Sequence, residues 1–166
     1  MLGCGTILRE VIAAAELLEK DWDVAADVWS ATSFTELRRD GLAADRWNLL
    51  HPEDKPRVPY VTRCLEKHPG PVVAASDYMK TFAEQIRPFM PQEGARGRVY
   101  RVLGTDGFGR SDSRARLRHF FEVNRYFIVI AALKALADAG DGTVKAVAEA
   151  IRKYDIDPEK PDPTAV

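Results

Sequence analysis

The sequence predicts an α/β domain, a three-layer α/β/α sandwich built around a mostly parallel sheet of four to five strands. Short apolar runs alternate with longer stretches of helical periodicity, and this order of elements is typical of parallel-sheet folds. The chain has 166 residues, of which 46% are hydrophobic and 30% charged, the size and composition of one globular domain. We place this domain at residues 1–157 and a polar, proline-rich C-terminal tail at residues 158–166.

The chain begins with a strand and a strongly periodic helix. Leu2–Gly5 predicts a strand that runs into a turn, and we expect this strand to be truncated because it starts at residue 1 or 2. From Leu8 to Leu18 the apolar residues recur at positions i, i+3, i+4 and i+7, which predicts a helix with one buried face. Val24–Ser30 contains bulky apolar residues and predicts the second strand.

A capping box marks the start of the next helix. Ser33 and Glu36 have the spacing in which the serine accepts a bond from the first turn and the glutamate reaches back. We expect this helix to end near Asp40–Gly41, because glycine commonly follows the last residue of a helix. Three prolines exclude a regular helix from His51 to Pro59, so the sequence predicts an ordered loop there.

The rest of the chain continues the alternation of helices and strands. Val72–Ser76, a short apolar run bounded by turn residues, predicts the best-defined strand. Tyr126–Ala139 is apolar almost all round, which indicates a helix buried between layers. Further helices are predicted at 61–67, 78–86, 114–121 and 143–154, and a strand at 99–103. Ser111 and Ser113 are candidate N-caps for the helix that begins near residue 114.

Composition and charge exclude several classes of partner. The formal net charge is −1 and no acidic or basic block dominates, so we expect no nucleic acid and no membrane surface as partner. No apolar run approaches the roughly 20 residues that cross a bilayer, and the N-terminus does not have the pattern of a secretion signal. Cys4 and Cys64 lie far apart without metal-ligand spacing, so we interpret them as free thiols of a cytoplasmic protein.

The sequence predicts no catalytic residue, no metal site and no cofactor-binding site in this chain. Its three histidines share no metal-ligand spacing, and the G-x-S-x-G nucleophile motif is absent. Asp106 and Asp112 could form an acid/base pair, but the sequence does not fix their separation. The Gly3–Thr6 turn could present backbone N–H groups to a phosphate, although it lacks the dinucleotide fingerprint and the P-loop lysine. We therefore interpret it as a tight strand-to-helix turn.

The Gly-rich segment, Val102–Ser113, is the most informative part of the sequence. It joins an apolar run to a helical pattern through three glycines, and such a turn commonly lies at the functional edge of an α/β sheet. Phe108 lies between two glycines, where an aromatic ring has little to pack against within its own domain. The arginines that follow it are interpreted either as a docking patch or as a solvated basic face. The five candidate interface residues are Asp106, Phe108, Arg110, Arg114 and Arg118.

Five segments together resemble the C-terminal domain of the homodimeric decarboxylating component of bacterial pyruvate dehydrogenase complexes. They are Val28–Gly41, Arg46–Pro52, Pro56–Tyr60, Ser76–Lys80 and the Gly-rich segment, and the resemblance runs from about Leu2 to the tail. This family is one of the transketolase-like, thiamine diphosphate-dependent enzymes. The resemblance implies a three-layer α/β/α domain with a five-stranded mixed sheet, in which one edge strand is antiparallel. Cys4 departs from the serine that the family more often has, at a position that we interpret as structural.

The resemblance also implies that this chain is one domain of a larger oxidoreductase and is inactive alone. In the family, earlier domains hold thiamine diphosphate, Mg²⁺ and the catalytic residues that decarboxylate pyruvate and acetylate a lipoyl group. The implied role here is a scaffold that contacts those domains, the second subunit and the dihydrolipoyl acetyltransferase component, with the five candidates near the lipoyl channel. The alternative is a free-standing α/β nucleotide-binding or regulatory module that uses the Gly3–Thr6 turn.

Overall fold

The computed structural model describes residues 1–92 and 97–166 and confirms the α/β/α sandwich. Its sheet has the strand order β2-β1-β3-β4, and every pair of neighbouring strands is parallel. The strands are β1 (Leu2–Gly3), β2 (Trp29–Ser30), β3 (Val72–Ala75) and β4 (Tyr100–Leu103). The described residues include no antiparallel edge strand of the kind that the resemblance implied.

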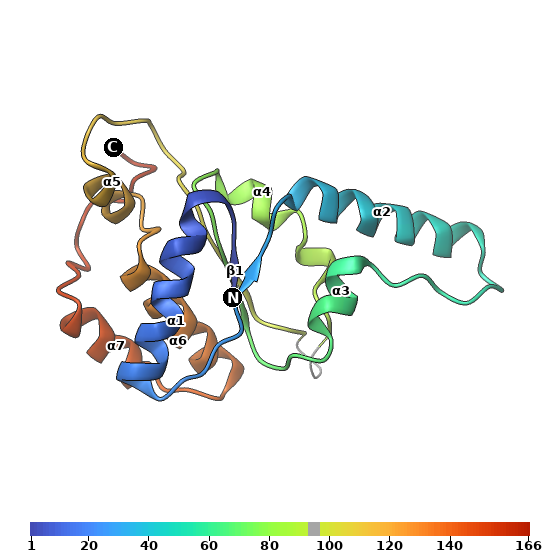
Figure 1. Ribbon diagram of the computed structural model, residues 1–166, viewed down its shortest axis with the longest axis horizontal. Helices are drawn as coiled ribbons and strands as arrows, with labels where there is room; N and C mark the ends of the chain where they lie inside the picture. Colours follow the sequence, from blue (N-terminus) through green and yellow to red (C-terminus); the bar gives the residue numbers. More distant parts are fainter. Residues whose placement is uncertain (93–96) are drawn as a thin grey trace.

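The helices surround this sheet in the order that the sequence predicts. They are η1 (Gly5–Ile7), α1 (Leu8–Trp22), α2 (Phe34–Leu50), α3 (Tyr60–Leu65), α4 (Lys80–Glu84), η2 (Arg87–Phe89), α5 (Arg114–Phe120), α6 (Arg125–Ala139) and α7 (Val144–Lys153). Helices α1, α6 and α7 lie on one side of the sheet, and α2, α3 and α4 lie on the other (Figure 1).

Strand β3 separates two hydrophobic cores. Val73 and Ala75 point into the core formed with α1, α6 and α7, whereas Val72 and Ala74 point into the core formed with α2, α3 and α4. All four residues are buried, because successive side chains of a strand point to opposite faces and both faces are covered. This two-sided burial explains why the strand is a continuous apolar run instead of an alternating one.

Helix α2 is longer than predicted, and the expected end at Asp40–Gly41 is wrong. Gly41 lies inside the helix, where a Cβ atom would stand 2.5 Å from the ring of Phe89. The glycine therefore permits close packing of η2 on the helix and does not terminate it. The capping box is only half formed, because Ser33 accepts from the backbone N–H of Glu36 while the Glu36 carboxylate pairs with Arg39.

Two other predicted elements are shorter than expected. Strand β2 covers only the last two residues of Val24–Ser30, because Asp23 ends α1 in a left-handed conformation and Val24 still donates to the carbonyl of Leu18. The predicted helix at 78–86 begins two residues late, since Ser76 Oγ holds the turn that includes Tyr78.

A buried carboxylate ties α1 to α5 and α6. Glu10 is only 6% exposed, and its two oxygens accept bonds from the side chains of Arg118 (2.8 Å) and Arg125 (3.0 Å) and from the backbone N–H of Arg125 (3.1 Å). Burial acts to raise the pKa of Glu10, but the hydrogen bonds and charges of the two arginines outweigh it and lower the pKa below its ordinary value of 4.5. The carboxylate is therefore held ionised inside the fold.

We predict that Glu10→Gln lowers the free energy of unfolding at pH 7 by about 2 kcal/mol, since it leaves two guanidiniums without their counter-charge. A group whose folded pKa is lowered stabilises the fold above its ordinary pKa, and this stabilisation disappears as the pH falls through the folded value. The difference in the free energy of unfolding between parent and variant should therefore shrink below about pH 4.5. Denaturant unfolding from pH 7 to pH 3 measures it, with Glu19→Gln on the exposed side of α1 as control. A difference that is absent at pH 7, or that stays constant into acid, would contradict this account.

Candidate functional site

The turns that follow β1, β3 and β4 meet at the carboxyl edge of the sheet. Because the three strands are parallel, their carboxyl ends face the same way, and this edge is where open α/β sheets commonly bind ligands. A hollow of about 390 Å³ lies here and is lined by residues from these turns and from α5. We call it the carboxyl-edge hollow; its polar lining includes Thr6, Asp77, Thr105, Arg110, Arg114 and Arg118.

Hydrogen bonds hold the three turns together on one side of this hollow. The hydroxyl of Thr6 donates to the Asp77 carboxylate (3.1 Å), and the hydroxyl of Thr105 donates to the Asp77 carbonyl (2.8 Å). Burial raises the pKa of the neighbouring Cys4 thiol, and the charge of Asp77 raises it further. Cys4 is therefore a protonated, packed side chain, in agreement with its predicted structural role.

The position of Asp77 argues against the alternative interpretation, in which the Gly3–Thr6 turn binds a phosphate. Its carboxylate takes the Thr6 hydroxyl and lies next to Gly5, where a Cβ atom would stand 3.3 Å from Asp77 Oδ1. A fixed negative charge beside this turn repels phosphate. The interpretation as a tight strand-to-helix turn is the one that the geometry supports.

The first part of the Gly-rich segment is a close contact between two backbones. A Cβ atom on Gly104 would lie 2.6 Å from the carbonyl oxygen of Tyr78 and 2.7 Å from the backbone nitrogen of Lys80. The carboxylate of Asp106 accepts the backbone N–H of Lys80 (3.2 Å) and so caps the first turn of α4. Asp106 therefore joins the turn after β4 to the helix after β3.

The C-terminal tail contacts the Gly-rich segment at Gly107. This glycine has a φ of 110°, and a Cβ atom there would overlap the carbonyl oxygen of Pro163, which is buried. Lys160 donates to the carbonyl of Phe120 (3.1 Å) and pairs with Glu122 (2.8 Å). The chain thus ends beside α5 (Figure 1), folded back on its own domain.

The structure brings three of the five candidate residues together. Arg110, Arg114 and Arg118 all line the carboxyl-edge hollow. Arg118 is engaged by Glu10, whereas neither Arg110 nor Arg114 forms an ion pair with a carboxylate in residues 1–92 and 97–166. Phe108 does not line the hollow; its side chain is 79% exposed and points to no core.

The other candidate groups of the sequence are engaged separately. Asp106 caps α4, while Asp112 accepts from the N–H of Ser113 and lies 3.9 Å from Arg116. Ser113 caps α5 by accepting from the backbone N–H of Arg116, as predicted. Within the described part of the chain, no group of three or more His, Cys, Asp or Glu side chains is arranged to hold a metal ion.

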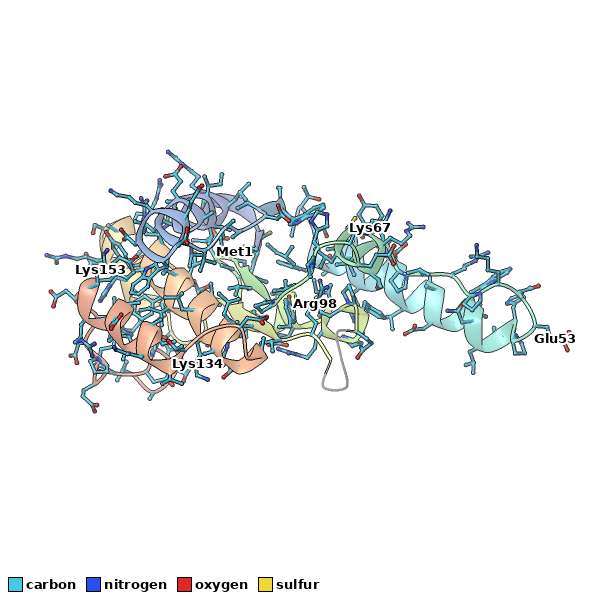
Figure 2. The ribbon with its side chains drawn as sticks, turned by 90° about the horizontal axis from the view of Figure 1, so that it is seen from below. Met1, Glu53, Lys67, Arg98, Lys134 and Lys153 are labelled. Carbon is cyan, nitrogen blue, oxygen red and sulfur yellow. The ribbon has the colours of Figure 1, made fainter. Side chains whose placement is uncertain are left out.

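The sequence predicted the ordered loop from His51 to Pro59 but not the projecting feature to which it belongs, which we call the α2 arm (residues 41–59). Helix α2 and the returning loop extend away from the sheet, with Glu53 at the far end (Figure 2). Trp47 stacks on His51 with 3.6 Å between ring centroids. The guanidinium carbon of Arg57 lies over the Trp47 ring, 3.4 Å from its centroid. Two hydrogen bonds between Asn48 and the backbone of Arg57 close the loop on the helix.

The α2 arm is ordered but contributes little to the core of its own chain. Leu49 and Leu50 are 78% and 54% exposed, and Val58 is 43% exposed. The apolar residues near the end of α2 could have indicated the arm. Because the helix was predicted to end at Gly41, these residues were not recognised as part of a helix.

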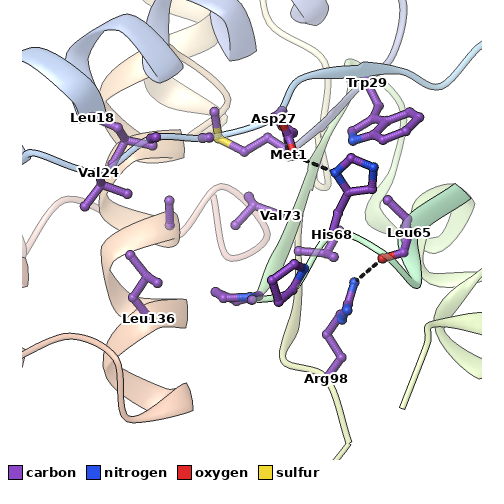
Figure 3. Close-up of a pocket in the computed structure, with 17 residues that line it drawn as sticks. Met1, Leu18, Val24, Asp27, Trp29, Leu65, His68, Val73, Arg98 and Leu136 are labelled. Carbon is purple, nitrogen blue, oxygen red and sulfur yellow. Dashed lines mark hydrogen bonds and ion pairs between the residues drawn. The ribbon is translucent and has the colours of Figure 1, made fainter. Parts of the chain in front are cut away.

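A second hollow, of about 180 Å³, lies at the amino edge of the sheet. Met1, Val73 and Leu136 form its apolar lining (Figure 3). His68 borders it from the loop between α3 and β3, bonded to the carboxylate of Asp27 (2.7 Å) and edge-on to the ring of Trp29. The imidazole is thus held in place by its neighbours, in agreement with its predicted loop position.

Comparison with known proteins places the chain in a family. A family model described as the transketolase-like TK C-terminal domain matches residues 1–124. The chain belongs to the transketolase-like C-terminal domain family. In this family context, the four parallel strands and their two helical layers form a transketolase-like C-terminal domain.

Three relatives of this transketolase-like C-terminal domain are pyruvate dehydrogenase E1 components. That of Pseudomonas aeruginosa is 61% identical over 163 residues, which are 98% of this chain and 18% of the relative. That of Cupriavidus necator is 58% identical over 166 residues, or 100% of this chain and 18% of the relative. That of Escherichia coli K12 is 54% identical over 163 residues, with 98% and 18% covered. The chain therefore spans 18% of the length of these relatives.

No helix in the described part of this transketolase-like C-terminal domain is both long enough and apolar enough to cross a membrane.

We predict that Gly104→Ala lowers the free energy of unfolding by about 1–3 kcal/mol, because the new methyl group overlaps backbone atoms that are fixed by the Asp106 cap. Gly109→Ala is the matched control in the same segment, where a Cβ atom meets nothing within 4 Å. Its effect should stay within about 0.5 kcal/mol. Equal stability of the two variants in thermal and denaturant unfolding would show that the close approach of Gly104 to the turn after β3 does not contribute to the stability of the fold.

Proposed function

We propose that this chain is the C-terminal scaffold and interface domain of a thiamine diphosphate-dependent pyruvate dehydrogenase component, an oxidoreductase that works in the cytoplasm. One observation carries the proposal: the chain matches pyruvate dehydrogenase E1 components over 98% of its length while it spans only 18% of theirs. On this proposal the parent enzyme decarboxylates pyruvate and acetylates a lipoyl group.

The cofactor chemistry would take place outside this domain. Mg²⁺ that holds a diphosphate requires several oxygen ligands, from carboxylates, carbonyls or water. At the carboxyl-edge hollow, Asp77 contributes one carboxylate beside the guanidiniums of Arg110 and Arg114. Since this set of groups does not fit a Mg²⁺–diphosphate pair, we assign no step of the cofactor's chemistry to this chain.

Two exposed features support an interface role. Phe108 presents a large aromatic ring at the tip of the Gly-rich segment, and aromatic residues are common anchors of protein interfaces. The α2 arm presents Leu49 and Leu50 beside the stacked side chains of Trp47, His51 and Arg57. We propose that the arm contacts the other domains or the second subunit of the parent homodimer.

The Gly-rich segment would face the dihydrolipoyl acetyltransferase component. Of the five candidates, Asp106 and Arg118 are held by contacts within the domain. Phe108, Arg110 and Arg114 keep exposed side chains for a contact near the lipoyl channel. The pair Phe108 and Arg110 is the most informative to change, because each lies in the segment and neither supports the sheet.

We expect a chimera to retain activity when this chain replaces the matching 163 residues of the P. aeruginosa relative. A scaffold domain of the same family should restore the dimer and the oxidation of pyruvate in the presence of thiamine diphosphate and Mg²⁺. Size-exclusion chromatography with light scattering and an assay with an artificial electron acceptor measure the two properties. A folded, dimeric chimera without activity would argue against the proposal.

In that chimera, Phe108→Ala combined with Arg110→Ala should lower the rate of lipoyl acetylation about fivefold or more, since anchors of an interface contribute on the order of 1 kcal/mol each. Decarboxylation followed with the artificial acceptor should be nearly unchanged, because it does not require the lipoyl domain. Arg116→Ala, an exposed arginine on α5 outside the hollow, is the control. Equal losses in both assays with an intact dimer would point to an active-site contact and contradict the interface role.

A further inference from the structure

The carboxyl-edge hollow contains positive charge that the chain does not neutralise. Within residues 1–92 and 97–166, the side chain of Arg114 has no hydrogen-bond or ion-pair partner. The guanidinium of Arg110 has none either and lies over the ring of Phe120, at 4.1 Å from its centroid. The neighbouring arginines differ, because Arg116 pairs with Asp112 and Arg118 pairs with Glu10. Two guanidiniums therefore line one hollow with their donors unused by protein.

The backbone next to these guanidiniums also has unused donors. From Gly107 to Ser111, no backbone N–H donates to another residue in the described part of the chain. These residues are exposed, and Gly109 has open space at the position of a Cβ atom. Consecutive free N–H groups in a turn form concave sites that bind anions, and glycines let a ligand approach the backbone closely.

The size and the lining of the hollow fit a small molecule better than a single ion. Its volume of about 390 Å³ lies in the range of small-molecule pockets. Ile7, Leu117, Phe121 and Val123 supply an apolar lining on which the body of a ligand can rest. Arginine is the side chain best suited to hold the oxygens of a phosphate, because its fork of N–H groups makes parallel hydrogen bonds.

The negative group in the hollow restricts where an anion can bind. Asp77 belongs to the lining, but neither Arg110 nor Arg114 pairs with it. Its carboxylate is engaged with Thr6, next to the Gly3–Thr6 turn. An anion is therefore repelled from that turn and attracted to the side formed by the Gly-rich segment and α5.

We propose that the carboxyl-edge hollow binds the phosphate group of a small phosphorylated molecule. The guanidiniums of Arg110 and Arg114 and the free amides of the lining residues Gly107, Gly109 and Arg110 hold the phosphate oxygens, and the apolar lining holds the remainder of the molecule. This site does not rest on the role proposed for the domain in a pyruvate dehydrogenase component, and it differs from the Gly3–Thr6 turn.

Titration of the 166-residue chain with inorganic phosphate and with pyrophosphate tests the proposal. At constant ionic strength set with chloride, amide resonances of Gly107 and Gly109 should shift and saturate. Arg114→Gln and Arg110→Gln should each weaken the apparent affinity about tenfold, the loss expected when a charged hydrogen-bond donor is removed. Arg116→Gln, on the same helix but outside the hollow, should bind like the parent.

Each other outcome overturns the assignment. Amide shifts that do not saturate, or an apparent affinity that is as high in Arg114→Gln as in the parent, would show that the hollow is not a phosphate site. Equal weakening by Arg116→Gln would indicate general screening of surface charge. Equal affinity for the succinate dianion would remove the preference for phosphate. Circular dichroism and thermal unfolding of each variant establish that the fold is intact, and none of these readouts depends on the activity of the chimera.

Discussion

The two-sided burial of β3 is the constraint on which the rest of the structure depends. Ala74 and Ala75 are fully buried, and their small side chains let helices pack closely on both faces of the sheet. The strand pairs in parallel with β1 on one side and β4 on the other. Since parallel strands end at the same edge, this central strand brings the turns after β1, β3 and β4 to one place, and that place is the carboxyl-edge hollow.

The side chains at this edge divide into two groups. Thr105, Asp106 and Arg118 bond to neighbouring elements and keep the turns in position. The side chains of Phe108 and Arg114 form no comparable bond with any other residue that the structure describes, and they remain exposed. The first group explains why the edge is ordered, and the second supplies the groups that a ligand or another protein surface can meet.

Local pattern was sufficient to predict most elements of the fold. The periodicity of α1, the apolar run of β3 and the cap by Ser113 depend on neighbours within a few residues, so the sequence expresses them directly. Gly41 misled the prediction because its role depends on Phe89, which the sequence does not place beside it. The ion pair between Glu10 and Arg118 could not be predicted either, because the two residues lie far apart in the sequence. The structural role of Arg118, a predicted site residue, was missed for this reason.

The proposed role requires that this domain positions other parts of an enzyme and does not itself hold the cofactor. Calorimetric titration of the 166-residue chain with thiamine diphosphate in the presence of Mg²⁺ tests it most directly. We expect no saturable heat that requires Mg²⁺, because Asp77 is the one carboxylate among the described lining residues of the carboxyl-edge hollow. Any heat from a diphosphate group held by Arg110 and Arg114 should be the same without Mg²⁺. A saturable heat with one molecule bound per chain that appears only with Mg²⁺ would contradict the account.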